Sequence, residues 1–73
     1  MIDMVATGEN ITRMRLEHDM TVKQLMKAVG LTSVQAVYKW ENGNGVPSID
    51  VLMRMSDVFG VSINDIRVFS FLS

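Results

Sequence analysis

One short run, residues 34–43 with the sequence VQAVYKWENG, holds the side chains best suited to specific recognition. In a helix, successive side chains are about 100° apart around the axis. On such a wheel one side collects Ser33, Ala36, Val37 and Trp40, and the opposite side collects Val34, Gln35, Tyr38 and Lys39. We expect Trp40 and Val37 to be buried, since they would remove much apolar surface from water and fix the orientation of the helix. The other side is then left as an outer face of mixed polar chemistry.

That outer face suits the major groove of DNA. Gln can bridge the two edge atoms of adenine, Lys can donate to guanine or phosphate, and a Val methyl can touch a thymine methyl. Tyr can donate to phosphate or stack on sugar. A polar outer face is also what any solvated helix presents, so the wheel by itself leaves both interpretations open.

The surrounding sequence predicts an all-α fold with five short helices. The expected helices are residues 8–18, a two-turn helix from Thr21 to Gly30, residues 33–42 capped by Thr32 or Ser33, a helix from Ser48 to Gly60 and a last turn opened by Ser62 and Asp65. Three of the methionines, Met14, Met26 and Met55, fall on core faces. Only the last residues, RVFSFLS, hint at strand alternation. We expect one domain over residues 1–73, with a core over 7–66 and an apolar tail over 67–73.

Composition argues against several classes of protein. The chain has no cysteine and one histidine, so neither a disulfide nor a zinc site can be assembled, and we assign His18 no role. The acidic residues are scattered, and no glycine-rich phosphate loop is present, so we expect no enzyme, metal, cofactor or small-molecule substrate. The N-terminus carries an acid where a secretory signal needs positive charge, and no apolar run is long enough for a membrane helix. We expect a soluble, cytoplasmic protein that binds no membrane.

Net charge is the main observation against nucleic acid. The chain carries 7 basic and 8 acidic residues, a net charge of −1, and its pI is about 5.6. Because affinity for the phosphate backbone depends on Lys and Arg, any binding to DNA must come from local placement of charge.

Three segments follow one another in the chain: MTVKQLMKAVGL, TSVQAVYKWENG and PSIDVLMRMSDVFGVSINDI. Together they resemble the Cro- and phage-repressor-type helix-turn-helix family of bacterial transcription regulators. The resemblance covers residues 11–66, and KWENG, the PS that follows it and FGVSINDI are its most specific pieces. It implies a compact five-helix domain that docks its third helix in the major groove, usually as a homodimer on a two-fold symmetric operator.

Carried over by position, the resemblance makes Val34, Gln35, Tyr38 and Lys39 base-facing and puts Ser33 near a phosphate or base. It implies a structural pair between Arg15 and Glu41. The turn before the third helix is one residue longer than in the commonest members, and the following loop, NGNGV, lacks the basic residues often found there. We expect the phosphate contacts to come from Thr21, Lys23 and Asn44, with help from the partial positive charge at helix N-termini.

Two alternatives concern the tail and the function. The tail residues Val68, Phe69, Phe71 and Leu72 either pack back on the first helix or are buried against a second subunit, and we favour a homodimer. Our hypothesis is a small sequence-specific repressor that binds a double-stranded operator. The alternative is a protein-interaction module, antitoxin-like or adaptor-like, that keeps the fold with weak or no affinity for DNA. The acidic pI, the neutral loop and the apolar tail favour that alternative.

Overall fold

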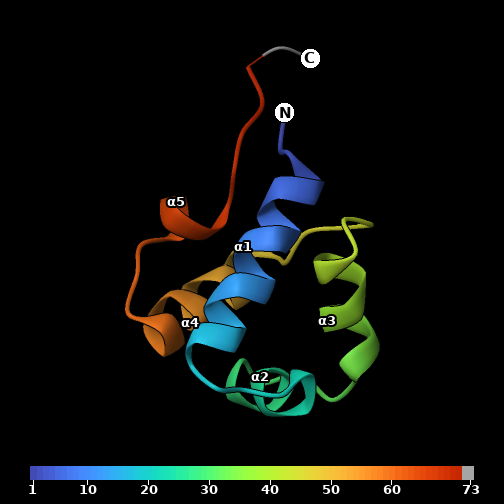
Figure 1. Ribbon diagram of the computed structural model, residues 1–73, viewed down its shortest axis with the longest axis vertical. Helices are drawn as coiled ribbons and strands as arrows, with labels where there is room; N and C mark the ends of the chain where they lie inside the picture. The colour runs from blue at the N-terminus through green and yellow to red at the C-terminus, as the bar shows by residue number, and fades with distance from the viewer. Residues whose placement is uncertain (72–73) are drawn as a thin grey trace.

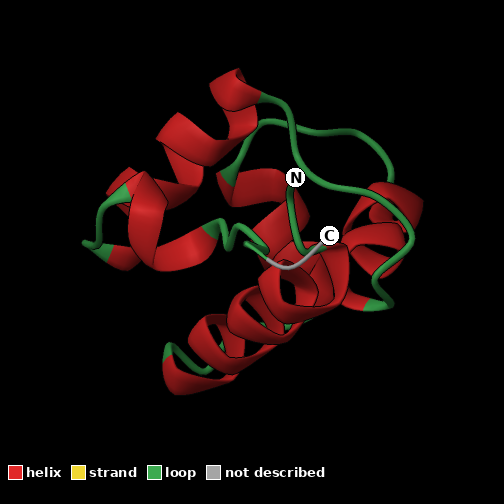
Figure 2. Cartoon of the chain, turned by 90° about the horizontal axis from the view of Figure 1, so that it is seen from above, coloured by secondary structure: helices red, strands yellow, loops and turns green. Residues whose placement is uncertain are grey.

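The computed structural model describes residues 1–71 and shows an all-α fold, as predicted. The helices are α1 (Met4–Glu17), α2 (Val22–Ala28), α3 (Val34–Glu41), α4 (Ile49–Phe59) and α5 (Ile63–Ile66). In Figure 1 α1 runs through the middle of the molecule, with α3 on its right, α2 below and α4 and α5 on its left. Figure 2 shows only helices and loops over the described residues. Within residues 1–71, no helix is both long and apolar enough to cross a membrane.

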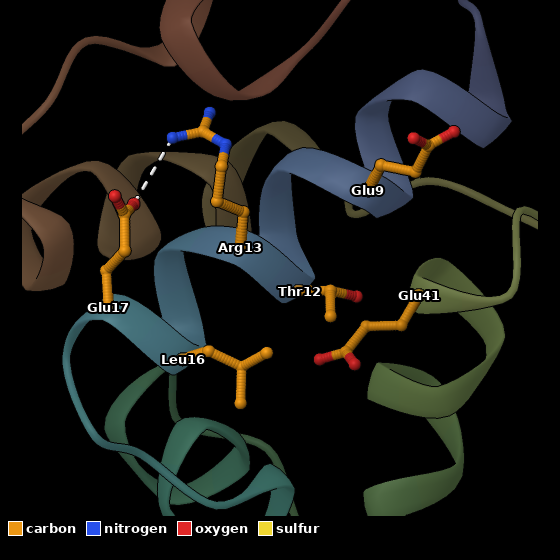
Figure 3. A pocket seen from close by; sticks show the side chains of 6 residues that line it. All are labelled: Glu9, Thr12, Arg13, Leu16, Glu17 and Glu41. Atoms are coloured by element: carbon orange, nitrogen blue, oxygen red, sulfur yellow. Dashed lines mark hydrogen bonds and ion pairs between the residues drawn. The ribbon is translucent and has the colours of Figure 1, made fainter.

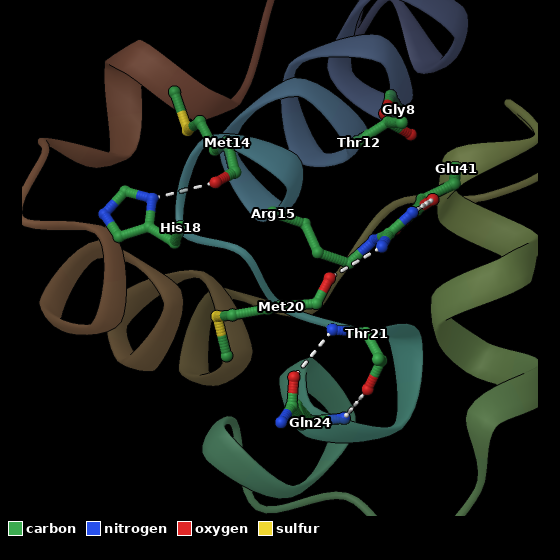
Figure 4. Close-up of polar contacts among 9 residues, drawn as sticks. All are labelled: Gly8, Thr12, Met14, Arg15, His18, Met20, Thr21, Gln24 and Glu41. Atoms are coloured by element: carbon green, nitrogen blue, oxygen red, sulfur yellow. Dashed lines mark hydrogen bonds and ion pairs between the residues drawn. The ribbon is translucent and has the colours of Figure 1, made fainter.

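Polar side chains begin α2, α3 and α4 at the positions that the sequence indicates. Thr21 and Gln24 form a reciprocal capping box, in which the Thr21 hydroxyl accepts from the Gln24 amide at 3.1 Å and the Gln24 side chain accepts from the Thr21 amide at 2.8 Å (Figure 4). Ser33 caps α3 by accepting from the Gln35 amide, and Ser48 caps α4. Each cap satisfies a backbone N–H that the helix cannot satisfy itself.

The helix ends follow one pattern. Gly30, Gly43 and Gly60 adopt left-handed conformations, with φ of 78°, 76° and 67°, within two residues of the ends of α2, α3 and α4. Glycine meets no Cβ penalty in this conformation, and the residue after it can donate back to the last turn. These three predicted ends are confirmed. At the end of α1 the same conformation falls on Asp19, with φ of 53°.

The predicted start of the first helix, near residue 8, is wrong. The helix begins four residues earlier because the Asp3 side chain accepts a hydrogen bond of 3.0 Å from the Ala6 amide and caps the first turn. Thr7 and Gly8 therefore lie inside α1, where both are buried. A threonine followed by glycine is typical of a helix boundary, and this local signal was misleading.

Side chains from all five helices form the core. Its buried apolar members are Ile11, Met14, Leu25, Met26, Val29, Val37, Trp40, Val51, Leu52, Met55, Phe59 and Ile66. The core positions predicted for Met14, Met26 and Met55 are confirmed. Ile49, the first residue of α4, is 52% exposed, whereas Val51 in the same turn is buried.

The two ends of the described chain lie together, as Figure 1 shows at the top of the molecule. Ile2 and Phe69 form a single antiparallel bridge, and the Asp3 amide donates to the Val68 carbonyl at 2.8 Å. The Val68 amide donates to the Thr7 hydroxyl at 3.0 Å. Residues 68–70 therefore pack back against the start of α1, the first of the two arrangements expected for the tail. Leu72 lies outside the described residues.

Candidate nucleic-acid interface

Helix α3 has one buried side and one outer side, as the wheel predicts. Val37 is fully buried and Trp40 nearly so, with an exposed fraction of 7%. Gln35, Tyr38 and Lys39 are exposed, and half of the Tyr38 surface is accessible. The apolar side faces α1 and α2, which lie next to α3 in Figure 1. Three side chains able to reach base edges or phosphates thus project from one rigidly packed helix.

The first two residues of this predicted surface differ from the other three. Ser33 is exposed, and its hydroxyl accepts the hydrogen bond that begins α3. Val34 is half-buried and packs against the hydrophobic core. Only part of the Val34 side chain is therefore accessible to a ligand, whereas Gln35, one residue later, is exposed.

Arg15 and Glu41 join α1 to the last residue of α3. The Arg15 guanidinium donates two hydrogen bonds to the Glu41 carboxylate, of 2.7 and 3.1 Å, and a third of 2.8 Å to the Met20 carbonyl (Figure 4). Both side chains are largely buried, with exposed fractions of 13% and 10%. The hydrogen bond to Glu41 raises the pKa of Arg15 above its ordinary value, although burial opposes this. The pair therefore fixes α3 relative to α1 and to the turn before α2, and breaking it would leave a buried charge.

Gly8 provides a second contact between α1 and α3 that the sequence reasoning missed. A Cβ at this position would lie 2.1 Å from the backbone carbonyl oxygen of Trp40 and 3.2 Å from that of Glu41. The two helix backbones approach this closely only because residue 8 has no side chain. Nothing in the local sequence distinguishes this contact from an ordinary helix start.

The loop after α3 is tied back to the helix. The Asn44 amide donates to the Lys39 carbonyl at 2.9 Å, and the Gly43 amide donates to the Trp40 carbonyl at 3.0 Å. Gly43 also abuts Val5 of α1, because a Cβ there would lie 2.9 Å from a Val5 methyl group. Asn44, predicted to contact phosphate, is exposed in this loop.

The charge around α2 and α3 is locally positive despite the acidic total. All three lysines of the chain, Lys23, Lys27 and Lys39, lie on these two helices, and all are exposed. Glu41 is their only acidic residue, and Arg15 neutralises it. Thr21, also predicted at a phosphate, precedes Lys23, and its amide is already engaged by Gln24. Any phosphate contact in this region would therefore depend mainly on the lysines.

A groove of about 580 Å³ lies between α1 and the last residue of α3. Figure 3 shows its lining, which consists of Glu9, Thr12, Arg13, Leu16 and Glu17 from α1 and Glu41 from α3. Arg13 pairs with Glu17 at 3.2 Å. Glu41 is paired with Arg15, and Arg13, the one basic residue in the lining, is paired with Glu17, so the described lining of the groove offers no unpaired positive charge to a phosphate. Across the described part of the chain, no three carboxylate, histidine or cysteine groups gather closely enough to hold a metal ion.

Comparisons with known proteins agree with this architecture. A family model described as helix-turn-helix matches residues 11–66. The chain is also similar in structure to the clp gene regulator ClgR from Corynebacterium glutamicum, with a TM-score of 0.76, 22% sequence identity, and coverage of 86% of this chain and 66% of that chain. At that identity the likeness shows a shared fold, and the chain spans just under two thirds of that protein. No curated protein matches the chain. Because the family model covers most of the sequence, the chain belongs to the helix-turn-helix family.

Proposed function

We propose that this protein is a sequence-specific DNA-binding regulator that inserts α3 into the major groove of an operator. The observation that carries the proposal is the division of α3 into a buried side, with Val37 and Trp40, and an exposed side, with Gln35, Tyr38 and Lys39. A short helix held from behind in this way presents base-reading side chains without having to order a loop. Ser33 and the accessible part of Val34 extend the proposed surface at its start.

Phosphate contacts would orient the domain on the duplex. We assign them to Lys23, Asn44 and the N-terminal turn of α2 at Thr21, which flank α3 in the fold. Since the site offers few lysines, the affinity should be modest, and it should fall with salt with a slope of about −0.9 for each phosphate neutralised. The acidic residues outside α2 and α3 would keep the rest of the molecule away from the backbone of DNA.

The length of α3 supports action as a homodimer. Its 8 residues span about 12 Å at 1.5 Å per residue, which corresponds to about 3–4 base pairs at a rise of 3.4 Å. So few base pairs cannot specify one site among the many competing sites in a genome. Two copies on a two-fold symmetric operator would double the sequence read and place the half-sites about one helical turn apart.

Repression is the simplest outcome of such binding. A dimer bound across an operator would exclude polymerase or a competing protein from the same DNA. ClgR is itself a gene regulator, as its name states, and we extend a regulatory role to this chain as part of the proposal. The protein would act in the cytoplasm, where its operator lies.

A protein-interaction module is the second candidate. The observations that favour it are the acidic pI and the exposed aromatic rings of Phe69 and Phe71 near the C-terminus. Such a module would bind a protein partner through this end and would show no preference among duplexes.

One experiment separates the two candidates. A library of random duplexes is selected for binding to the full chain, and the enriched duplex is titrated by fluorescence anisotropy at two salt concentrations against a scrambled duplex. Tighter binding to the enriched duplex than to the scrambled one, with both affinities falling as salt rises, supports the regulator. Failure to enrich any sequence would contradict it and favour the interaction module.

Substitutions on α2 and α3 test the residue assignments. Gln35→Ala should cost about 1–3 kcal/mol on the enriched duplex and relax the preference at one base pair. Lys23→Ala should weaken all duplexes about equally and lower the salt slope by about one. Exposed Glu9 of α1, which is not among the residues assigned to the interface, provides the control, since Glu9→Gln should change neither property. If all variants bind like the wild type, the assignments are wrong.

A further inference from the structure

Gly45 lies directly against the side chain of Lys39. A Cβ built at residue 45 would lie 3.0 Å from Lys39 Cε, 3.4 Å from Cδ and 3.5 Å from Cγ. Three successive carbons of the lysine stem therefore run past this glycine. Unlike Gly43, Gly45 has no positive φ, so its backbone conformation is open to any residue. A side chain at this position would instead crowd the Lys39 stem.

The loop around Gly45 is anchored independently of the lysine stem. Its hydrogen bonds go from the Asn44 amide to the Lys39 carbonyl and from the Gly43 amide to the Trp40 carbonyl, and Gly43 packs against Val5. The three atoms nearest to a Cβ added at residue 45 all belong to the flexible Lys39 stem, while the loop backbone that carries the Cβ is held in place. The stem is the part that would move.

We propose that Gly45 is a positioning residue for Lys39, and this inference rests on the proposed function. Because residue 45 has no side chain, the stem of Lys39 can lie against the loop at Gly45, which limits the directions in which its charged end extends. A free lysine samples many rotamers and loses that freedom when it contacts a phosphate or base. A stem already laid against the loop loses less, so the contact is stronger.

Gly45→Ala is the test. We expect it to weaken binding to the enriched duplex by about two- to tenfold, the range for losing the preorganisation of one flexible side chain. The charge of Lys39 remains, so the salt slope should stay that of the wild type. In a Lys39→Ala background, the same Gly45→Ala change should have no further effect on affinity. Such non-additivity would show that Gly45 acts through Lys39, because a purely structural effect of Gly45→Ala would be the same in both backgrounds.

Gly60 supplies the matched control. It also lies in an exposed turn after a helix, but a Cβ there would meet nothing within 4 Å, and its φ of 67° disfavours any other residue. Gly60→Ala should lower the melting temperature and leave the affinity of the folded protein unchanged. Gly45→Ala should show the opposite pattern, with lower affinity and little change in melting temperature.

A measurement on the free protein tests the geometry without DNA. In the full chain, nuclear Overhauser effects are expected between the Gly45 Hα protons and the γ, δ and ε protons of Lys39. Their absence in a protein that binds its enriched duplex would overturn this inference alone. The inference would also be overturned if Gly45→Ala lowered the affinity equally in the wild-type and Lys39→Ala backgrounds, or if it did not lower the affinity in the wild-type background. If the nuclear Overhauser effects are present but the protein prefers no duplex, the proposed function fails, and the inference fails with it.

Discussion

At the scale of single residues, the candidate interface depends on side chains that never reach its surface. Trp40 and Val37 fix which side of α3 faces outward, and the Arg15–Glu41 pair holds the end of the helix. Gly8 allows α1 to approach the α3 backbone more closely than any other residue would. The exposed residues of α3 depend on these buried contacts for their position, since a surface helix has little else to orient it.

Gly8→Ala tests this close approach. In an ordinary helix interior alanine is favoured over glycine by about 0.8–1.0 kcal/mol. Here the added Cβ would meet the Trp40 carbonyl oxygen, which belongs to the backbone and cannot rotate away. We expect a net loss of about 1–3 kcal/mol in the free energy of unfolding, measured by urea denaturation. Glu9→Ala, an exposed change on the same helix, should stay within about 0.5 kcal/mol of the wild type. A Gly8→Ala protein at least as stable as the wild type would mean that the helices are not in this contact.

The buried residues of α3 could be predicted from sequence, but Gly8 could not. Periodicity places Trp40 and Val37 on the inner face because burial of large apolar side chains is the dominant local signal. The close approach of Gly8 to Trp40 joins residues far apart in the chain. The sequence around a single glycine does not indicate which distant backbone it contacts. The resemblance to helix-turn-helix proteins was needed to pair Arg15 with Glu41, since no spacing rule connects them.

At the scale of elements, the helix boundaries that carry a local sequence signal were predictable, and the two boundaries of α1 that lack one were not. Three of the four left-handed ends fall on glycine, which made Gly30, Gly43 and Gly60 predictable from sequence. The fourth falls on Asp19, which gives no such signal. The early start of α1 was missed for a similar reason, because the cap at Asp3 precedes a segment whose apolar residues remain exposed.

Asp19→Gly should therefore stabilise the protein. A left-handed conformation costs a non-glycine residue about 1–2 kcal/mol, although Asp tolerates it better than most. A carboxylate at a helix C-terminus is also unfavourable by about 0.3–1 kcal/mol. Glycine adds entropy to the unfolded chain, which offsets about 0.4–1 kcal/mol of the gain. We expect a net stabilisation of about 0.5–1 kcal/mol, seen as a higher melting temperature in calorimetry.

Asp19→Asn separates the two contributions, because it removes the charge and keeps a side chain that tolerates the left-handed region. Asp19→Gly should be the more stable of the two variants. Equal stability would assign the whole gain to charge and would contradict the role of backbone conformation at this helix end.

At the scale of the whole molecule, charge and apolar surface are distributed unevenly. All three lysines lie on α2 and α3, while exposed apolar residues gather where the chain ends meet. Met1, Phe69 and Phe71 are all exposed there, and Phe71 is 93% accessible. The pairing of Ile2 with Phe69 was not predictable, since one bridge between distant residues leaves no periodic pattern. Only the apolar composition of the tail indicated that this end has a structural role.

We expect this apolar end to form a contact between two copies of the chain. Burying a phenylalanine side chain contributes about 1.5–3 kcal/mol, and Phe71 buries almost none of its surface within one copy. Phe71→Ser should therefore leave the melting of the dilute protein unchanged and weaken dimerisation by about tenfold or more, measured by sedimentation equilibrium over a range of concentrations. Met53→Ser, an equivalent change at an exposed apolar residue of α4, should have no effect on the association. If Phe71→Ser dimerises as strongly as the wild type, or if the wild type remains monomeric at every concentration, two-fold operator recognition through this end is contradicted, and the short reach of α3 would need another source of specificity.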